Sequence, residues 1–208
     1  MIRVHHLNNS RSQRVLWLLE ELGQPYEVVR YQRKPNMLAP DELKRIHPLG
    51  KSPVIEDDNN TFAETGLIVE YLVDRYGPDL APPRGTDLYW RYKYWLHYAE
   101  GSLMPPLLLK LVIDRLGLLG YPARGFVKSQ LKLHLDFVEA ELAEAPWFVG
   151  ERFCAADIMM SFPLEAAAGR GGLAHTRPRL MDFLARIHAR PAYRRALERG
   201  GAYRYATA

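Results

Sequence analysis

Cysteine is almost absent from this chain of 208 residues, because Cys154 is the only one. A single cysteine excludes an internal disulfide, a Cys-x-x-Cys redox pair and a cysteine-based zinc cluster. Any redox chemistry must therefore use a thiol that another molecule supplies. The seven histidines also lack the HxxxH and HExxH spacings of metal motifs, so we expect no metal site.

Long apolar runs are missing as well. A helix that crosses a membrane needs about 18 consecutive apolar residues, and even the stretch 103–112 is interrupted by two prolines and Lys110. The first six residues lack the continuous apolar segment of a secretory signal. We therefore expect no membrane span and a cytoplasmic location.

Positive charge is unevenly distributed along the chain. Residues 170–208 carry nine arginines against two acidic residues, so this stretch has a net charge of +7 within a total of +4. Nucleic-acid-binding proteins combine such arginines with aromatic residues in known motifs, and none is present, so we expect no nucleic-acid partner. The stretch is interpreted as a solvated basic helix face, or as a positive field that attracts a small anionic ligand.

The rest of the composition is typical of a folded protein, with 48% hydrophobic and 25% charged residues. Residues 2–7 and 26–31 have strand patterns, and between them Val15, Leu18 and Leu22 recur at helical spacing. A crossover of this length implies a parallel pair of strands.

A hairpin and a second long helix are predicted after this unit. A short helix near residues 40–46 leads to two strands, 54–56 and 61–63, which turn-forming residues separate. A helix is then predicted over residues 65–76. The predicted order is βαβαββα, which places the N-terminal part in the α/β class.

The segment 77–85 has the composition of a connector between domains, with three prolines and two glycines. We therefore predict a first domain over residues 1–77, a linker over 78–85 and a second domain over 86–208. Every element predicted in the second domain is a helix, and adjacent prolines at 105 and 106 are expected to kink or break the first of them.

The turn between the first strand and the first helix is one candidate site. Free backbone amides and the positive end of the helix dipole stabilise an anion there. Asn9 and Ser10 occupy this turn, and the Ser10 hydroxyl can add a hydrogen bond. A serine is also a common helix N-cap, so both interpretations of Ser10 stay open.

Two further candidate sites lie near the predicted hairpin. Ser52 precedes Pro53 and must be extended; with a cis bond between them, the Ser52 amide and carbonyl would be free to bind a peptide-like ligand. Glu64 and Thr65 begin the next helix, and such a pair can bind the ammonium and carboxylate of an amino acid. Helix capping is the alternative interpretation of the second pair.

In order and spacing these motifs resemble the glutathione transferase family, over essentially the whole chain. The resemblance is particularly close to a branch that fungi and bacteria share. The matching segments are residues 9–14, 16–22, 46–53, 64–65, 100–106, 148–150, 156–164 and 190–193.

The resemblance implies a thioredoxin-like N-terminal domain, an all-helical C-terminal domain and a homodimer. Glutathione would be the cosubstrate, bound by the N-terminal domain. Ser10, or Asn9 beside it, would face the glutathione thiol. The family differs among its branches on which of these two adjacent positions acts.

Five further residues would hold the remainder of glutathione by this resemblance. The backbone of Ser52, beside a cis-Pro53, would pair with the cysteinyl part. Glu64 and Thr65 would bind the γ-glutamyl end, and Lys51 would approach a carboxylate.

The second substrate is expected to be a small apolar electrophile or an organic hydroperoxide, bound between the domains. Tyr94, Tyr98 and Met104 are the candidate lining residues, since aromatic and thioether side chains suit a permissive apolar pocket. A stripe of this kind is also typical of ordinary core packing. A noncatalytic binding or regulatory module is the alternative function. A thiol-disulfide reductase is a third possibility, but it normally has a cysteine where this chain has Asn9 and Ser10.

Residues 153–158 resemble a helix capping box that departs from the usual pattern. Asp157 stands at the position of the acid that reaches back to the first residue of the box, but Cys154 replaces the usual serine or threonine. A thiol is a weak hydrogen-bond partner, so we expect half of the reciprocal pair to be poor.

Overall fold

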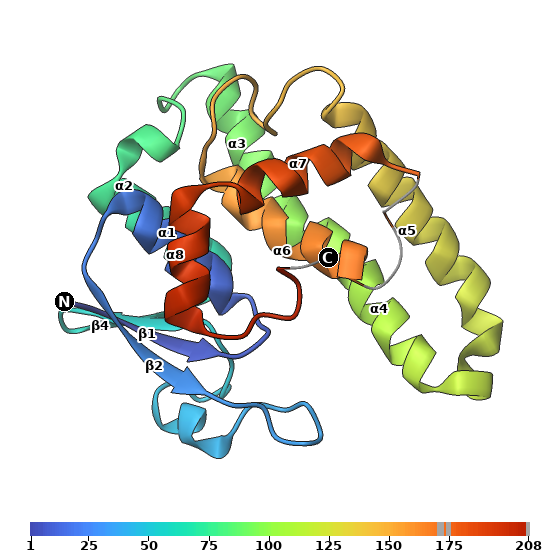
Figure 1. The fold of residues 1–208 in the computed structure, drawn as a ribbon, viewed down its shortest axis with the longest axis horizontal. Helices are drawn as coiled ribbons and strands as arrows, with labels where there is room; N and C mark the ends of the chain where they lie inside the picture. Colours follow the sequence, from blue (N-terminus) through green and yellow to red (C-terminus); the bar gives the residue numbers. More distant parts are fainter. Residues whose placement is uncertain (170–172, 174–175, 207–208) are drawn as a thin grey trace. The chain divides into compact units, whose positions relative to one another are not determined.

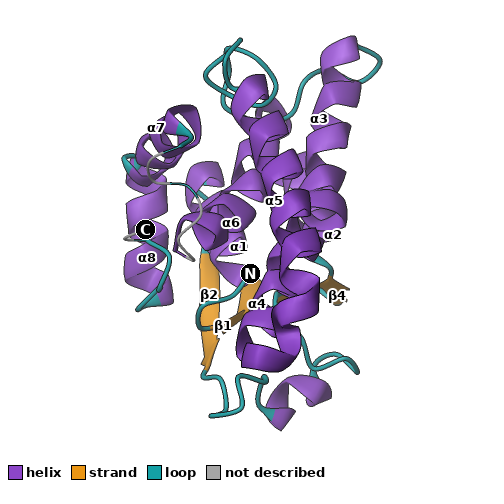
Figure 2. Cartoon of the chain, turned by 90° about the vertical axis from the view of Figure 1, so that its right-hand side faces the viewer, coloured by secondary structure: helices purple, strands orange, loops and turns teal. Residues whose placement is uncertain are grey.

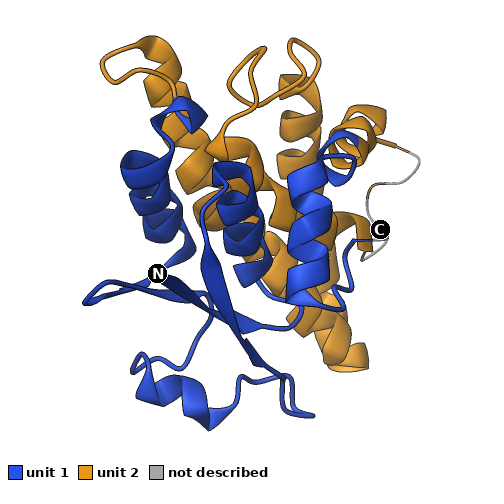
Figure 3. Ribbon diagram, turned by 60° about the vertical axis from the view of Figure 1, so that its left-hand side comes forward, with its two compact units in different colours: residues 1–81, 186–207 blue, residues 82–185, 208 orange. Residues whose placement is uncertain are grey.

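The computed structural model describes residues 1–169, 173 and 176–206 (Figure 1). Contacts divide the chain into two compact units, residues 1–81 with 186–207 and residues 82–185 (Figure 3). This grouping assigns the last helix to the first unit, whereas composition alone assigned it to the domain 86–208. The linker predicted at 78–85 stays a prediction.

A mixed four-stranded sheet forms the framework of the first unit. Strand β1 (Ile2–Leu7) pairs in parallel with β2 (Tyr26–Tyr31) and antiparallel with β3 (Val54–Asp57), which pairs antiparallel with β4 (Asn60–Ala63). The resulting strand order is β2-β1-β3-β4. The predicted βαβαββα order and the thioredoxin-like class are confirmed, with a 3₁₀ helix at Asp41–Arg45 in place of the short helix near 40–46.

Three α-helices complete the first unit: α1 (Ser12–Leu22), α2 (Thr65–Tyr76) and α8 (Pro191–Gly200). Val15, Leu18 and Leu19 of the apolar stripe of α1 are fully buried, while Leu22 at its end is half-buried; the helical spacing predicts such an inward face. Gly23 ends α1 with a φ of 63°, and its amide bonds to the carbonyl of Glu20. A left-handed glycine of this kind is a common helix terminator, because it has no Cβ to oppose a positive φ.

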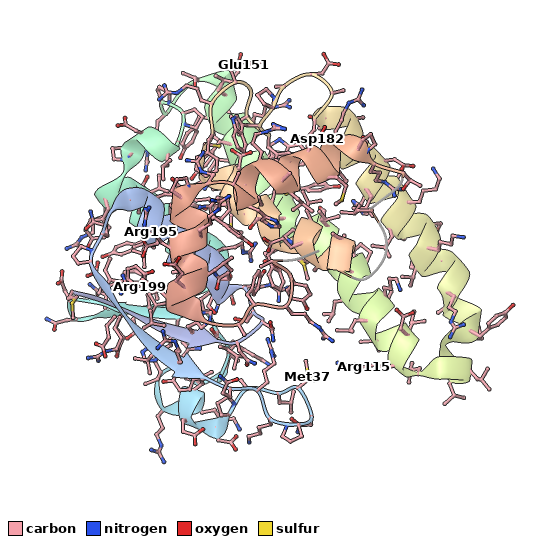
Figure 4. The ribbon with its side chains drawn as sticks, viewed as in Figure 1. Met37, Arg115, Glu151, Asp182, Arg195 and Arg199 are labelled. Atoms are coloured by element: carbon pink, nitrogen blue, oxygen red, sulfur yellow. The ribbon has the colours of Figure 1, made fainter. Side chains whose placement is uncertain are left out.

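Arginines of α8, and Arg190 just before it, form ion pairs with acidic residues of α1. Arg190 donates two hydrogen bonds to the Glu21 carboxylate, at 2.5 and 2.9 Å. Arg195 pairs with Glu20 at 2.7 Å, and the Arg199 guanidinium lies 3.7 Å from the centre of the Tyr26 ring. Arg195 and Arg199 are labelled on α8 in Figure 4. Part of the positive excess near the C-terminus is thus neutralised within this unit, although the Arg195 and Arg199 side chains stay 51% and 42% exposed.

The described part of the second unit is built from helices (Figure 2). They are α3 (Asp87–Tyr98), α4 (Met104–Arg115), α5 (Tyr121–Glu141), α6 (Ala155–Gly169) and α7 (Pro178–His188). The break that the paired prolines predict is present, because a π-helical turn at residues 99–103 separates α3 from α4. No helix in the described residues combines the length and the apolar character needed to cross a lipid bilayer.

The core of the second unit centres on α6. Ile158, Met159 and Leu164 on this helix are fully buried, and the Phe148 ring packs against Trp95 and Phe183 with centroids 4.7 and 5.0 Å apart. Since α6 is apolar around most of its surface, burial on several sides is the arrangement that its composition favours.

The start of α6 has the capping geometry that residues 153–158 predict. One oxygen of Asp157 accepts a hydrogen bond from the Cys154 amide at 2.8 Å, and the other accepts one from the Phe148 amide at 2.9 Å. Burial raises the pKa of the Cys154 thiol well above its usual value. The acid therefore satisfies two buried amides, while a neutral thiol occupies the position of the hydroxyl.

This cap can be tested by substitution. Asp157→Ala should lower the free energy of unfolding by about 2 kcal/mol or more, because two buried amides lose their acceptor. Asp157→Asn keeps one acceptor oxygen and should lose less. Cys154→Ser should raise stability by about 0.5 to 2 kcal/mol, because a hydroxyl oxygen is the better cap. Chemical denaturation measures all three, and a less stable Cys154→Ser variant would show that the thiol acts as a packed apolar group.

The α1–α8 pairing predicts a pH dependence. Burial raises the pKa of Glu20, but hydrogen bonds from Arg195 and Tyr26 outweigh this effect, so that the pKa lies below its usual value of 4.5. The stability from this group is therefore present above about pH 4.5 and is lost as the pH falls through the lowered pKa.

Glu20→Gln should cost about 1 kcal/mol at pH 7, because Glu20 is largely buried but its partner Arg195 is exposed. The cost should shrink in acid, where the wild-type carboxylate is protonated as well. Glu27→Gln is the matched control, because it removes an exposed partner of Arg3; it should change stability little at either pH. Equal losses from both variants in denaturation curves would contradict a special role for the α1–α8 pair.

Candidate functional site

The strand register brings the three candidate segments to one end of the sheet. His5 of β1 lies opposite Val54 of β3, and Val54 lies opposite Ala63 of β4. Strands β1 and β4 therefore end where β3 begins. The β1–α1 turn, the segment before β3 and the start of α2 meet at this end.

Ser10 in the β1–α1 turn belongs to a buried chain of hydrogen bonds. Its side chain accepts from the Ser12 amide at 3.2 Å and lies 2.7 Å from the Ser12 hydroxyl, which in turn lies 2.9 Å from Nδ1 of His6. Burial, with the nearby charge of Arg30, lowers the pKa of His6 to about 4, so the ring is neutral at pH 7. With Ser10 only 4% exposed, this arrangement favours the interpretation of Ser10 as a cap of the helix start.

Asn9 presents its side chain differently. Its backbone has a φ of 51°, a conformation that asparagine tolerates better than most residues. The side-chain oxygen accepts a hydrogen bond from the Arg204 amide at 2.6 Å. Because the oxygen is engaged by a backbone donor, the NH₂ group of Asn9 is the part that can donate to a ligand.

Arg33 is a residue of this site that the sequence did not single out. Its guanidinium donates to the carbonyls of Asn8 at 3.1 Å, Asn9 at 3.3 Å and Met37 at 2.9 Å; Met37 is labelled in Figure 4. Burial lowers the pKa of Arg33 below its usual value, yet the group stays positively charged at neutral pH. It fixes the shape of the turn and places a positive charge beside it.

No local sequence pattern indicates this role, because Arg33 follows β2 in a polar loop. Its contact with the turn depends on the parallel register that sets Leu7 of β1 beside Tyr31 of β2. The role of Arg33 could have been predicted from that register, because a long arginine side chain two residues past the end of β2 reaches the turn after β1.

Ser52 joins the start of β3 to β1 through its side chain. The hydroxyl accepts from the Leu7 amide at 3.2 Å and donates to the His5 carbonyl at 2.8 Å. The peptide bond between Ser52 and Pro53 is cis, as the resemblance implies. Within the described part of the chain, neither the amide nor the carbonyl of Ser52 has a hydrogen-bond partner. The backbone of Ser52 is therefore open to a ligand.

Glu64 and Lys51 place two opposite charges at the same end of the sheet. Glu64 has a φ of 71° and is exposed, and its side chain makes no capping bond to α2. Neither the Glu64 carboxylate nor the exposed Lys51 ammonium has an ion-pair partner among the described residues. Thr65 beside Glu64 is buried at the first position of α2. The structure thus brings together all five residues that the resemblance assigned to the non-thiol parts of glutathione.

The three candidate pocket residues lie in the second unit. Tyr98 and Met104 are buried, and the Tyr98 hydroxyl lies 2.7 Å from Nδ1 of His134. Tyr94 is 48% exposed and stacks on Tyr98. Burial favours core packing for Tyr98 and Met104, so that of the three Tyr94 offers the most surface to a ligand; a role in an electrophile pocket stays a prediction.

Metal chemistry has no evident site in the part of the chain that the structure describes. No group of three or more His, Cys, Asp or Glu side chains there could hold an ion. The groups that the described part of the site presents are an open peptide edge, two charges without an ion-pair partner and a helix start with a neighbouring cation.

A thioredoxin-like unit with such an edge, followed by an all-helical unit, is the architecture of a two-domain class of glutathione-binding proteins. Residues 1–74 match the family model of the glutathione S-transferase N-terminal domain, and residues 127–191 match that of the C-terminal domain. The chain belongs to the glutathione S-transferase family, and glutathione is its cosubstrate.

Individual relatives agree with this assignment. The chain is 40% identical to glutathione S-transferase 3 of Schizosaccharomyces pombe, over 80% of this chain and 74% of the relative. It is 33% identical to glutathione S-transferase 1 of Saccharomyces cerevisiae, over 97% and 96%. Among solved structures, a glutathione S-transferase from Actinobacillus pleuropneumoniae has a TM-score of 0.88 and 35% identity, covering 100% of this chain and 96% of that one.

Proposed function

We propose that this glutathione transferase activates the glutathione thiol at the β1–α1 turn, for attack on small apolar electrophiles or for reduction of organic hydroperoxides. The open backbone of Ser52 is the observation that carries the proposal, because a cysteinyl peptide group can pair with it as an added strand would. The free carboxylate of Glu64 suits the ammonium of the γ-glutamyl end. Thr65 beside it and Lys51 suit the two carboxylates.

The turn can supply the free energy that thiol activation needs. A thiol titrates near pH 8.5, and lowering its pKa by two units requires about 2.7 kcal/mol. A hydrogen bond to the charged sulfur contributes about 1.5 to 3 kcal/mol, and a helix N-terminus about 0.3 to 1. We assign the hydrogen bond to the NH₂ group of Asn9, since the Ser10 hydroxyl is engaged with Ser12. The charge of Arg33 favours the thiolate further.

Two reactions are open to this thiolate. In transfer, the thiolate sulfur forms a bond to the electrophilic carbon while that carbon either releases a leaving group with its electron pair or opens a double bond that then takes a proton from solvent; the proton of the thiol has already passed to solvent. In reduction, a hydroperoxide takes two electrons from two glutathione thiols and yields an alcohol, water and glutathione disulfide. A noncatalytic module would need no thiol activation, and the donor and cation at the turn favour the enzyme over this alternative.

Affinity for glutathione tests the proposed contacts. Glu64→Ala should weaken glutathione binding at least tenfold, about 1.4 kcal/mol, because the γ-glutamyl ammonium loses its partner. Asp79→Ala removes an exposed carboxylate elsewhere in the first unit and should leave the affinity unchanged. Titration calorimetry measures both, and an unaltered affinity in the Glu64 variant would remove the main argument for this site.

The pKa of bound glutathione separates the two candidate thiol residues. Asn9→Ala should raise that pKa, read from thiolate absorbance against pH, because the proposed donor is lost. Ser10→Ala should mainly lower the free energy of unfolding, by about 1 kcal/mol, as the loss of a helix cap does. A larger shift in the Ser10 variant would transfer the role to Ser10, and no shift in either would leave it to the backbone amides and Arg33.

We also propose that the protein is a homodimer. Phe126, Leu133 and Phe137 of α5 are 62%, 61% and 37% exposed, and their spacing places them on one face of the helix. An apolar stripe of this kind on a surface helix is typical of a protein interface.

Light scattering at micromolar concentration should give about twice the 23.9 kDa of one chain. Leu133→Glu should shift the mass toward a single chain, because it places a charge in the stripe, whereas Lys132→Glu beside it should not. A wild-type mass near that of one chain would reject the dimer.

We further propose a cytoplasmic location, where the glutathione pool keeps thiols reduced.

A further inference from the structure

A buried chain of hydrogen bonds links the β1–α1 turn to the end of helix α8. The side chains of Ser10, Ser12 and His6 form this chain, and their residues are only 4%, 0% and 3% exposed. Buried hydroxyl groups are hydrogen-bonded within the protein, because an unpaired donor there is costly. Each serine hydrogen therefore points along one contact of the chain, and the acceptors present decide which contact that is.

The end of α8 reaches the His6 ring. Helix α8 lies beside α1 (Figure 1), and a Cβ on its last residue, Gly200, would lie 3.0 Å from Cδ1 of Leu16 and 3.4 Å from Cε1 of His6. The absence of a side chain at Gly200 thus leaves room for the ring. The Gly200 carbonyl accepts a hydrogen bond from the ring, which raises the His6 pKa against the larger effect of burial. Since Nδ1 faces Ser12, the nitrogen that donates to Gly200 is Nε2.

This bond sets the direction of the whole chain. The His6 ring is neutral at pH 7, because its pKa is about 4, and a neutral imidazole carries a single N–H. With the hydrogen on Nε2, Nδ1 can only accept, and the Ser12 hydroxyl 2.9 Å away donates to it. The Leu7 carbonyl, 3.3 Å from the Ser12 hydroxyl, is also an acceptor. The contact of 2.7 Å between the Ser12 and Ser10 oxygens therefore uses the Ser10 hydrogen.

We infer that His6 is a positioning residue of this transferase: through Ser12 it directs the Ser10 hydrogen away from the glutathione sulfur. Asn9 is then left as the side-chain donor to the thiolate. In the opposite tautomer, His6 would donate from Nδ1 to Ser12. The Ser12 hydrogen could then pass to Ser10, and the Ser10 hydrogen would be free for the sulfur. The inference rests on the proposed thiol activation at this turn, and it assigns to the Gly200 carbonyl the choice between the two arrangements.

Nuclear magnetic resonance tests the tautomer without any ligand. In the full chain labelled with ¹⁵N-histidine, couplings between the ring nitrogens and carbon-bound hydrogens distinguish Nε2–H from Nδ1–H. The His6 signals are identified among those of seven histidines by their loss in a His6→Gln variant. His6 should be the Nε2–H tautomer at pH 7. The Nδ1–H tautomer, or a protonated ring, would overturn the inference.

The pKa of bound glutathione tests the consequence for the thiol. Ser12→Ala removes the acceptor of the Ser10 hydrogen and frees it for the sulfur, so the pKa should fall by about one unit, the effect of one added hydrogen bond to a charged group. The same substitution in a Ser10→Ala background should not lower it. Ser161→Ala is the matched control, because it removes another buried hydroxyl, which donates to the Ile158 carbonyl at 2.8 Å in α6; it should leave the pKa unchanged.

An unchanged or raised pKa in the Ser12→Ala variant would overturn the inference, provided that circular dichroism shows a folded chain. So would an equal fall in the Ser10→Ala background. Failure of the proposed function has a different signature, because it appears as the absence of glutathione binding to the wild-type protein in calorimetry. In that case the tautomer of His6 still decides the direction of the chain.

Discussion

The candidate site depends above all on the way Ser52 is attached to β1. A strand normally joins its neighbour through backbone groups, which are then no longer available to a ligand. Here the side-chain hydroxyl of Ser52 makes both bonds to β1, at Leu7 and His5. The segment before β3 is thus held in place while the backbone of Ser52 stays open. A valine or alanine at this position could keep the strand pattern, but it has no hydroxyl to bond to β1 in place of the backbone groups.

The second constraint is the attachment of the last helix. Arg190, Arg195 and Arg199 come from a stretch whose composition indicates a basic surface, yet they meet Glu20, Glu21 and Tyr26 of the first unit. Composition records the number of charges but not which distant residues oppose them. The segment that follows α8 then supplies the Arg204 amide that fixes the Asn9 side chain. The ion pairs between α8 and α1 therefore contribute to the stability of the first unit and also position the segment that orients the side chain of Asn9, the proposed thiol donor.

How well a feature could be predicted from the sequence depends on how far apart along the chain the interacting residues lie. Helix α1, the β3–β4 hairpin and the break at Pro105 were predictable, because apolar spacing, turn residues and proline act within a few positions. The capping role of Asp157 was predictable for the same reason. The choice between Ser10 and Asn9, and the role of Arg33, depend on hydrogen bonds between segments that only the sheet register and the docking of α8 bring together.

Two helices of the first unit are each preceded by a residue other than glycine with a positive φ. Asn9 precedes α1 with a φ of 51°, and Glu64 precedes α2 with a φ of 71°. A residue other than glycine in this region costs of order 1 to 3 kcal/mol, less for asparagine, so the surrounding structure must hold each one. The Arg33 guanidinium donates a hydrogen bond to the carbonyl of Asn9 in the first turn. In the second turn, the Ile68 amide donates to the carbonyl of Glu64 at 3.0 Å. In both turns the carbonyl is bound within the protein, while the side chain keeps a polar group, the Asn9 NH₂ or the Glu64 carboxylate, to which the proposed function assigns a contact with glutathione.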